Sequence, residues 1–257
     1  MKVLMLGDTH GQAMATERAF RYAKKNDCAR ILQLGDFGFG WKSRQIKGGQ
    51  TVDDFVYTVS KFVTRYGIEL DWIDGNHENH IDLNDLPLDA DGARTILPGV
   101  RHLPRGYRFE LGGRTFLAAG GAVSVDKKSR VPFISWWPGE ELSDADVVRC
   151  DGPPVDVLLT HDAPLGSMVF DYHMTEFGQQ AALESYANRK RISLIIEQAK
   201  PKWLFHGHMH HAYLQPPLPN APFFIKGLGF DEDPIDQAAC IFDLETLQVA
   251  SPLEKDT

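Results

Sequence analysis

Short polar segments that carry aspartate, asparagine or histidine beside glycine or threonine recur along the chain. In chain order they are Gly7-Asp8-Thr9-His10-Gly11, Gly35-Asp36, Gly75-Asn76-His77-Glu78, Thr160-His161-Asp162 and Gly207-His208-Met209-His210. Carboxylate oxygens mixed with imidazole nitrogens suit divalent manganese, iron, zinc or nickel. They suit calcium less, because calcium prefers oxygen ligands alone, and they differ from the thiolates of a structural zinc site. The segments therefore predict a site for divalent metal ions.

The spacing within two of these segments favours convergence on a metal. One residue separates Asp8 from His10, and one residue separates His208 from His210. In an extended segment the two side chains of such a pair point to the same side, where both can approach one cation. Glycine beside a ligand lets the backbone turn sharply off a strand and come close to the site. We therefore expect the ligands in tight turns directly after strands.

Each polar segment follows an apolar run that is typical of a buried strand. Residues 13–25 and 51–65 have the composition of helices, so strands and helices alternate in the first part of the chain. This alternation indicates βαβ units and a mainly parallel sheet, whose functional loops cluster at the carboxyl ends of the strands. The expected strands are residues 2–6, 30–34, 70–73, 155–160 and 203–205.

The second half of the chain is richer in strands, which could extend or back a second sheet. A Gly112-Gly113 turn predicts a hairpin, and residues 175–198 have the composition of a long helix. Neither an internal repeat nor a linker marks a boundary, so we expect a single domain over residues 1–257. The further strands expected here are residues 107–111, 114–119, 223–225 and 239–242.

Composition and charge narrow the class of protein. Among the 257 residues, 43% are hydrophobic and 24% are charged, which is typical of a soluble globular protein. The net charge of -8 argues against a main role in non-specific binding of a polyanion, so nucleic acid stays open as a partner but is not favoured. Cys28, Cys150 and Cys240 show none of the spacings of a zinc site or a disulfide framework, which fits thiols in a reducing compartment.

The N-terminal residues bear on location. The apolar run before Asp8 has no small-residue cleavage site behind it, so it predicts a strand rather than a signal peptide. No apolar stretch approaches the roughly 20 residues that a membrane-spanning helix needs. We therefore expect a cytoplasmic protein with no membrane partner. The sequence predicts no oligomeric state.

The set and order of the polar segments resemble the calcineurin-like metallophosphoesterase superfamily. The signature of that superfamily is D-x-H, G-D, G-N-H-[DE], H and G-H-x-H, and all of these motifs occur in order between Asp8 and His210. The resemblance implies an α/β fold, a two-sheet β-sandwich flanked by helices. This agrees with the alternating first half and the strand-rich second half.

The resemblance also implies a role for each motif residue. Asp36 would bridge two divalent metal ions, and His77 would be the catalytic imidazole. Manganese is favoured, and iron, zinc and nickel are compatible with the same ligands. The ligands implied for one ion are Asp8, His10 and His210, and those implied for the other are Asn76, His161 and His208.

Paired metals about 3.5 to 4 Å apart generate a hydroxide at neutral pH and clamp the phosphoryl oxygens during in-line attack. A protonated His77 could steady the developing charge or give a proton to the leaving oxygen, because imidazole titrates near neutral pH. The motif residues therefore predict hydrolysis of a phosphate ester.

One departure separates the chain from the protein serine/threonine phosphatase branch. In that branch the G-D motif continues with an aspartate that orients the catalytic histidine and an arginine that grips the phosphate. Here Gly35-Asp36 is followed by Phe37-Gly38-Phe39-Gly40-Trp41, and both residues are missing. A protein phosphatase is therefore disfavoured, and Glu78 or Asp74 could replace the orienting aspartate.

Several residues near the motifs are interpreted as structural rather than functional. His206 and His211 are left out of the metal site, because the motif residues already supply enough ligands, and His80 is expected in a loop. Packing is favoured over stacking on a nucleobase for the nearby aromatic side chains. Residues 124–139 are the candidate for a lid over the site. The aromatic residues in question are Phe39, Trp41, Trp136 and Trp137.

These observations favour a phosphodiesterase that acts on a small or nucleotide-type phosphodiester. A phosphomonoesterase or a dinucleoside polyphosphate hydrolase would use the same metals with different walls around the substrate, and a nuclease is a further alternative. A metal-binding protein without turnover is the non-enzymatic alternative. It is disfavoured because all the motif residues are intact.

Overall fold

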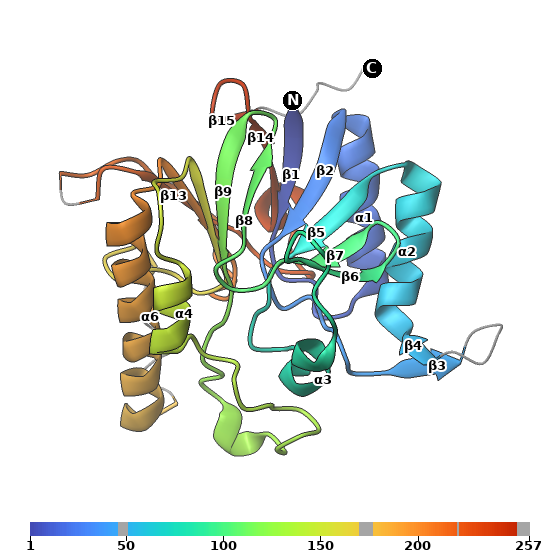
Figure 1. Cartoon of the computed structure of the whole chain (residues 1–257), viewed down its shortest axis with the longest axis horizontal. Helices are drawn as coiled ribbons and strands as arrows, with labels where there is room; N and C mark the ends of the chain where they lie inside the picture. Colours follow the sequence, from blue (N-terminus) through green and yellow to red (C-terminus); the bar gives the residue numbers. More distant parts are fainter. Residues whose placement is uncertain (46–50, 170–176, 220, 251–257) are drawn as a thin grey trace.

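The computed structural model of the chain describes residues 1–45, 51–169, 177–219 and 221–250. Two sheets stack face to face, and helices cover their outer faces (Figure 1). The predicted two-sheet sandwich flanked by helices is therefore confirmed. That residues 1–257 form a single domain stays a prediction.

The first sheet has seven strands in the order β15-β14-β1-β2-β5-β7-β6. Neighbouring strands in the run β1, β2, β5 and β7 are parallel, as the alternation of strands and helices predicts. Strands β14 and β6 pair antiparallel to this run. The strands are β1 (Lys2–Leu6), β2 (Cys28–Gln33), β5 (Glu69–Trp72), β6 (Arg94–Leu97), β7 (Val100–His102), β14 (Ala239–Asp243) and β15 (Gln248–Ala250).

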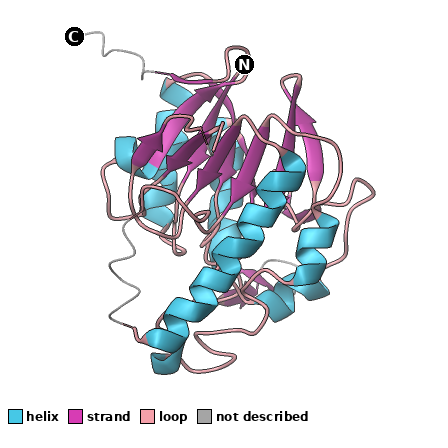
Figure 2. Cartoon of the chain, turned by 90° about the vertical axis from the view of Figure 1, so that its left-hand side faces the viewer, coloured by secondary structure: helices cyan, strands magenta, loops and turns pink. Residues whose placement is uncertain are grey.

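The second sheet has six strands in the order β12-β13-β11-β10-β9-β8, with β9, β10, β11 and β13 parallel. The predicted hairpin is β8 and β9, which pair antiparallel. Figure 2 shows the long helix α6 lying across this side of the molecule. The strands are β8 (Arg108–Leu111), β9 (Arg114–Ala119), β10 (Val157–Thr160), β11 (Trp203–His206), β12 (Tyr213–Gln215) and β13 (Phe224–Gly227).

Strand β1 shows why these strands are apolar throughout. Successive side chains of a strand point to opposite faces of the sheet. Val3 and Met5 pack between the two sheets, whereas Leu4 and Leu6 pack under the helices α1 (Ala13–Lys25) and α2 (Asp54–Tyr66). Both faces are buried, so a continuous apolar run rather than an alternating one is required.

Two predictions of local structure need correction. Residues 51–65 were expected to be helical, but Thr51–Asp53 forms strand β4, paired with β3 (Ser43–Gln45). Helix α2 begins only at Asp54, because the Asp53 carboxylate caps it by accepting a hydrogen bond from the Val56 backbone N–H. The prediction of His80 as a loop residue is also wrong, because it begins the short helix α3 (His80–Asp85).

The remaining helices lie mainly in the second half of the chain. Residues 175–176 of the long predicted helix fall outside the described part, and the helix is described from Gln179 onwards. Among the described residues, no helix combines the length and apolar character required to cross a membrane. The helices are α4 (Asp144–Arg149), α6 (Gln179–Ala199), α7 (Ile235–Ala238) and the 3-10 turn η1 (Lys127–Ser129).

Candidate metal centre

The polar segments converge at one edge of the sandwich, where β1, β2, β5, β10 and β11 end. These strands belong to both sheets, so the site lies across the junction between them. The structure brings the side chains predicted as metal ligands together in two adjoining clusters. The outer cluster is Asp8, His10 and His210, and the inner cluster is Asp36, Asn76, His161 and His208.

The outer cluster joins the ends of β1 and β11. Ligand atoms of Asp8, His10 and His210 all lie within 4.8 Å of one another. Nε2 of His210 is 3.1 Å from Oδ2 of Asp8, and Nε2 of His10 is 4.0 Å from the same oxygen. The Asp8 carboxylate also accepts a hydrogen bond from the His208 backbone N–H, which positions it between the two motifs.

The inner cluster is more deeply buried. Ligand atoms of Asp36, His161 and His208 lie within 4.8 Å of one another. Oδ1 of Asn76 is 3.3 Å from Nε2 of His161, so the amide oxygen reaches the same space. Nδ1 of His161 lies 2.6 Å from the Leu34 carbonyl oxygen, which orients the ring with Nε2 towards the cluster.

Asp36 belongs to both parts of the site. Its Oδ2 is 3.4 Å from Nε2 of His10, and its Oδ1 is 3.2 Å from Nε2 of His161. The carboxylate is only 2% exposed. Each oxygen therefore faces a different cluster, which is the arrangement that a carboxylate needs in order to contact two ions.

The spacing argument assumed an extended backbone in the motifs, but the backbone is not extended at most of the paired ligands. His10, Asp36, His208 and His210 have φ angles of 42°, 53°, 61° and 48°. These left-handed conformations are uncommon for residues other than glycine, and each costs about 1 to 3 kcal/mol. The paired ligands converge through strained turns, and His208 and His210 point into different clusters.

Glycine beside the ligands allows the close approach of the backbone to the site that the sequence predicts. A Cβ atom on Gly75 would collide with the Asp36 carboxylate and the His161 ring. A Cβ atom on Gly207 would collide with the Asp8 carboxylate. Any side chain at these positions would therefore occupy the space where the ligand atoms meet.

Buried acids and imidazoles in the site compensate one another. Burial raises the pKa of Asp36, but the neighbouring His161, His77 and His10 rings together hold it well below its ordinary value. Burial lowers the pKa of His161, but Asp36 and Asp8 raise it to about 10. A proton on His161 thus stabilises the same carboxylates that a cation would stabilise, so a metal ion held by this imidazole would displace that proton.

His77 sits at the margin of the site. Its Nε2 is 3.8 Å from Oδ2 of Asp36, and its backbone N–H donates to Oδ1 of the same residue. The indole N–H of Trp41 donates to the His77 carbonyl oxygen, and the Arg130 guanidinium lies against both ring nitrogens. Burial, together with the charge of Arg130, lowers the pKa of His77 to about 4 although Asp36 opposes this.

Neither candidate for orienting His77 contacts its ring. The buried Glu78 carboxylate instead accepts hydrogen bonds from the backbone N–H groups of Gly38 and Gly75, and so ties two motif loops together. Burial, with the nearby Asp36 charge, raises the pKa of Glu78 to about 8. The expectation that Glu78 or Asp74 replaces the orienting aspartate is therefore wrong.

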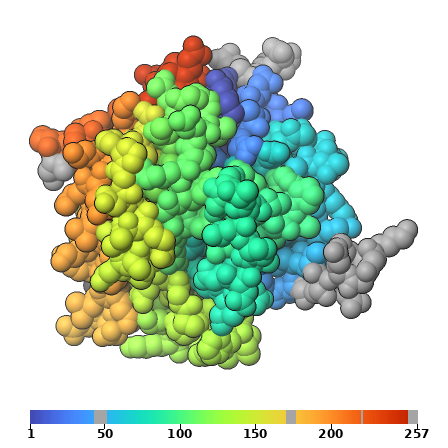
Figure 3. Space-filling view, in the orientation of Figure 1, coloured from blue at the N-terminus to red at the C-terminus, as the bar shows by residue number. Residues whose placement is uncertain are grey.

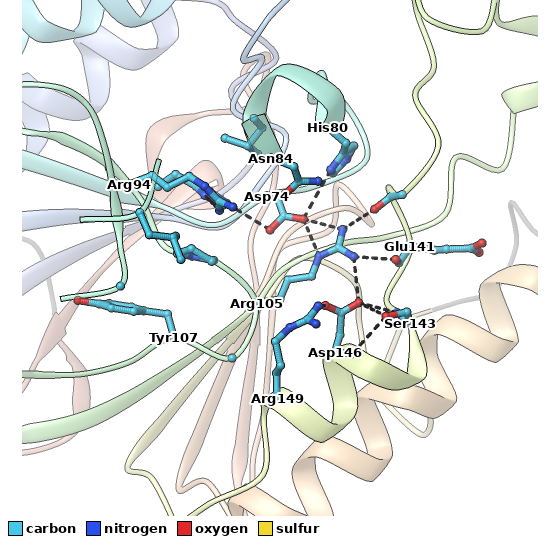
Figure 4. Close-up of a pocket in the computed structure, with 17 residues that line it drawn as sticks. Asp74, His80, Asn84, Arg94, Arg105, Tyr107, Glu141, Ser143, Asp146 and Arg149 are labelled. Carbon is cyan, nitrogen blue, oxygen red and sulfur yellow. Dashed lines mark hydrogen bonds and ion pairs between the residues drawn. The ribbon is translucent and has the colours of Figure 1, made fainter. Parts of the chain in front are cut away.

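Asp74 belongs to a separate network behind the motif loop. Figure 4 shows its carboxylate between Arg105 and the helix that carries His80, in the wall of a cavity of about 550 Å³. Nε of Arg105 donates to Asp74 at 2.8 Å, and His102 lies 3.4 Å away. The Asp74 carboxylate is therefore bonded to structural partners and does not point to the metal centre.

Two residues that the sequence did not single out support the outer cluster. Oδ1 of Asp231 lies 2.6 Å from Nδ1 of His10, and the Phe230 ring stacks on His210 with centroids 4.4 Å apart. The Arg18 side chain donates to the Asp231 carbonyl oxygen and holds this segment on helix α1. Phe230 and Asp231 follow β13, a parallel strand whose carboxyl end lies at the same edge.

Two further unpredicted residues support the inner cluster. The Asn76 amide N–H₂ donates to Ser124 Oγ at 3.1 Å, and the Ser124 hydroxyl donates to Glu140 at 2.6 Å. This chain of hydrogen bonds leaves the Asn76 amide oxygen free to face His161. Ser124 lies at the start of the predicted lid, and Glu140 directly follows it.

The remaining histidines and aromatic residues largely follow their predicted roles. His206 is buried and its Nε2 contacts the Tyr213 hydroxyl, outside both clusters. Phe39 and Trp137 are buried in packing positions. Trp41 is 44% exposed, so its ring packs against His77 while one part faces solvent.

Comparison with known proteins bears on this geometry. A family model described as calcineurin-like phosphoesterase matches residues 1–212. The chain belongs to this family. The resemblance seen in the motifs is thereby confirmed, and with it the class of metal-dependent hydrolases of phosphoesters. The match ends before Phe230 and Asp231. No curated protein matches the sequence.

Solved structures share the fold at low sequence identity. A protein of Thermus thermophilus aligns with a TM-score of 0.56 and 12% identity over 97% of this chain and 96% of that chain. A dimetal phosphatase from Danio rerio aligns with a TM-score of 0.52 and 11% identity over 94% and 91%. At these identities the likeness shows the fold alone.

The donor set fits the two metal ions on which this family depends. Carboxylate, amide and imidazole groups are the ligands that divalent transition metals accept. The two clusters share Asp36 and offer such groups within reach of one another. A ring nitrogen of His77 also lies within 4.8 Å of ligand atoms of His10 and Asp36. Distance alone therefore does not separate a metal ligand from a catalytic group.

Proposed function

We propose that this protein is a metal-dependent phosphodiesterase that hydrolyses a small or nucleotide-type phosphodiester in the cytoplasm. The observation that carries the proposal is the Asp36 carboxylate, whose two oxygens face the outer and inner clusters separately. A buried carboxylate shared in this way suits a pair of cations better than a single one.

Asp36 would bridge the two ions, for which manganese is the favoured metal. Such ions, when bound, would supply Lewis-acid stabilisation of the phosphoryl oxygens and a nucleophile at neutral pH. The left-handed turns and the absence of Cβ atoms at Gly75 and Gly207 support this use, because they hold donor atoms in a confined space. The proposed ligands are Asp8, His10 and His210 for one ion and Asn76, His161 and His208 for the other.

His77 is proposed as the group that assists the leaving oxygen. It lies beside Asp36 but at the margin of the site, and Trp41 holds its backbone in place. An imidazole N–H in this position could donate a hydrogen bond or a proton to the oxygen that departs. Its role is positional as much as acidic, because the ring must face the leaving group.

The preference for a diester rests on the wall beside His77. Trp41 is partly exposed and also lines a cavity of about 340 Å³ with Phe39 and Lys42. An exposed indole next to the reacting groups offers a flat surface for a nucleobase or another planar substituent. The lack of the protein-phosphatase arginine after Asp36 supports the same preference.

The proposal is tested by hydrolysis of bis-p-nitrophenyl phosphate and p-nitrophenyl phosphate. The protein is stripped with EDTA, and manganese, zinc, magnesium or nickel is restored one at a time. Diester turnover that returns with metal supports the proposal. Turnover of the monoester alone would identify a phosphomonoesterase, and inactivity with every metal would favour the metal-binding alternative.

The His77→Ala variant separates binding from catalysis. It should retain both metals, measured by elemental analysis, and lose most turnover. Loss of metal along with turnover would show instead that His77 is a ligand.

A further inference from the structure

The segment between β9 and α4 brings an arginine to the metal centre. In Figure 3 the yellow-green residues of this segment form the lower rim of the molecule. The Arg130 guanidinium is 15% exposed, and its Nε donates to Asp126 Oδ1 at 2.8 Å. Nη1 lies 3.2 Å from Nδ1 of His77, and Nη2 lies 2.9 Å from Nε2 of the same ring.

These contacts do not satisfy the guanidinium. A neutral imidazole has one lone pair for a hydrogen bond, because its other ring nitrogen carries a proton. Only one of the two terminal nitrogens can therefore donate to His77 at a time. Among the described residues, the other acceptor within reach of these terminal nitrogens is the Ser135 carbonyl oxygen, at 3.4 Å from Nη1. Arg130 thus presents spare donors beside the reacting groups.

The anchoring of Arg130 directs its terminal nitrogens. Asp126 accepts the hydrogen bond of Nε and leaves both terminal nitrogens to other acceptors, of which the His77 ring is one. The base of the segment is held by Ser124, which bonds the buried Glu140. A planar fork with two parallel N–H groups matches two oxygens of one phosphate group.

We propose that Arg130 is a substrate-binding residue that grips two non-bridging oxygens of the scissile phosphate. In this assignment the guanidinium leaves the His77 ring when the ester binds, and the ring is then free to turn its N–H to the leaving oxygen. His77 thus holds the fork in place until a better acceptor arrives. The proposal rests on the proposed function, because it takes a phosphoester as the ligand.

The test measures binding of inorganic phosphate to the metal-loaded full-length protein by calorimetry, and KM and kcat for bis-p-nitrophenyl phosphate. Arg130→Ala should weaken phosphate binding by about tenfold or more, as expected for a charge-assisted hydrogen-bonded pair. KM should rise with it, while metal content stays unchanged. Lys128→Ala removes an exposed cation from the same segment and should change neither quantity.

Arg130→Lys and chemical rescue separate substrate binding from a structural role. Lysine keeps the charge but not the fork, so Arg130→Lys should recover part of the phosphate affinity. Added guanidinium ion should restore binding to Arg130→Ala. If Arg130→Ala does not fold, the same comparison is made between wild type and Arg130→Lys, for which a KM equal to wild type overturns the proposal.

The outcomes distinguish this inference from the proposed function. One outcome is that the wild type hydrolyses the diester and that Arg130→Ala has the same phosphate affinity and KM as wild type. This outcome would overturn the role of Arg130 and leave the proposed phosphodiesterase activity intact. Phosphate binding that depends on Arg130, in a wild-type protein that hydrolyses no ester, would support the binding role and contradict the proposed activity.

Discussion

The two clusters of the metal centre differ in exposure. In the outer cluster the side chains of His210 and His10 are 39% and 16% exposed. In the inner cluster those of His161 and Asp36 are 0% and 2% exposed. A cation held by the inner groups would be nearly enclosed by protein, whereas one held by the outer groups would meet solvent. We expect the outer position to exchange its ion faster.

The clusters also differ in what supports them. The inner ligands are oriented by the Leu34 carbonyl and by Ser124, both within the part of the chain that matches the family model. The outer ligands depend on Phe230 and Asp231, which lie beyond that part. The inner half is therefore supported from within the part of the chain that matches the family model, while the outer half is completed by a segment beyond it.

The largest effect is expected where the two clusters meet. Asp36→Asn removes the charge that both clusters share, so both positions should lose metal together. Turnover should fall by about a thousandfold or more, equivalent to roughly 4 kcal/mol of barrier. Elemental analysis and diester kinetics measure the two losses, with Asp85→Asn, at an exposed position, as a control. Loss of metal from one position alone would show that Asp36 does not serve both clusters.

A smaller effect, confined to the outer cluster, is expected for Asp231→Asn. Carboxylates that bond a ligating imidazole typically contribute 10- to 100-fold in metal affinity. One ion should therefore bind about 10- to 100-fold more weakly while the other is retained. A calorimetric titration with manganese resolves the affinities of the two ions. The adjacent exposed residue provides the control Glu232→Gln, which should behave as wild type. Equal weakening of both ions would contradict the division into clusters.

The corresponding change on the inner side is Ser124→Ala. Without the hydroxyl, the Asn76 amide loses the partner that orients its oxygen. The inner ion should bind about tenfold more weakly, the lower end of the effect of losing a residue that orients a ligand. Ser193→Ala, in helix α6, serves as a control in the same titration. An effect on the outer ion would show that Ser124 acts through the fold rather than through Asn76.

The last effect concerns stability and pH rather than metal binding. Burial raises the pKa of Glu140 from 4.5 to about 7, although its bonds to Ser124 lower it. The folded state therefore holds a proton that the unfolded state releases, and stability falls as the pH rises from 4.5 to about 7. Glu140→Gln removes this loss, so its Tm relative to wild type should rise between pH 5 and pH 8 by an amount equivalent to roughly 2 kcal/mol. A constant difference across this range would contradict the assignment.

The sequence predicted the parts of the site that local pattern determines. Apolar runs that end in Gly-Asp or Gly-Asn-His identify strand ends, and parallel strands bring their carboxyl ends together. The left-handed conformations of His10 and Asp36 were not visible, because tertiary contacts rather than residue type stabilise them. The start of α2 was missed because the capping role of Asp53 outweighed the helical pattern before it.

The missed supporting residues share a different cause. Asp231 follows β13, which lies parallel to β11. Had this pairing been known, the residues after β13 would have been expected at the same edge as the ligands. That pairing is long-range and carries no local signal. Arg130 and Ser124 lie in a segment without regular strands, where only the suggestion of a lid pointed to the site.

In the proposed mechanism, turnover requires both clusters to hold an ion. The direct measurement is a manganese titration of the EDTA-stripped protein, with bound metal and diester hydrolysis followed in the same samples. This requirement predicts that turnover stays low while the first equivalent binds and rises as the second one binds. Full turnover at one bound equivalent, or without bound metal, would contradict it.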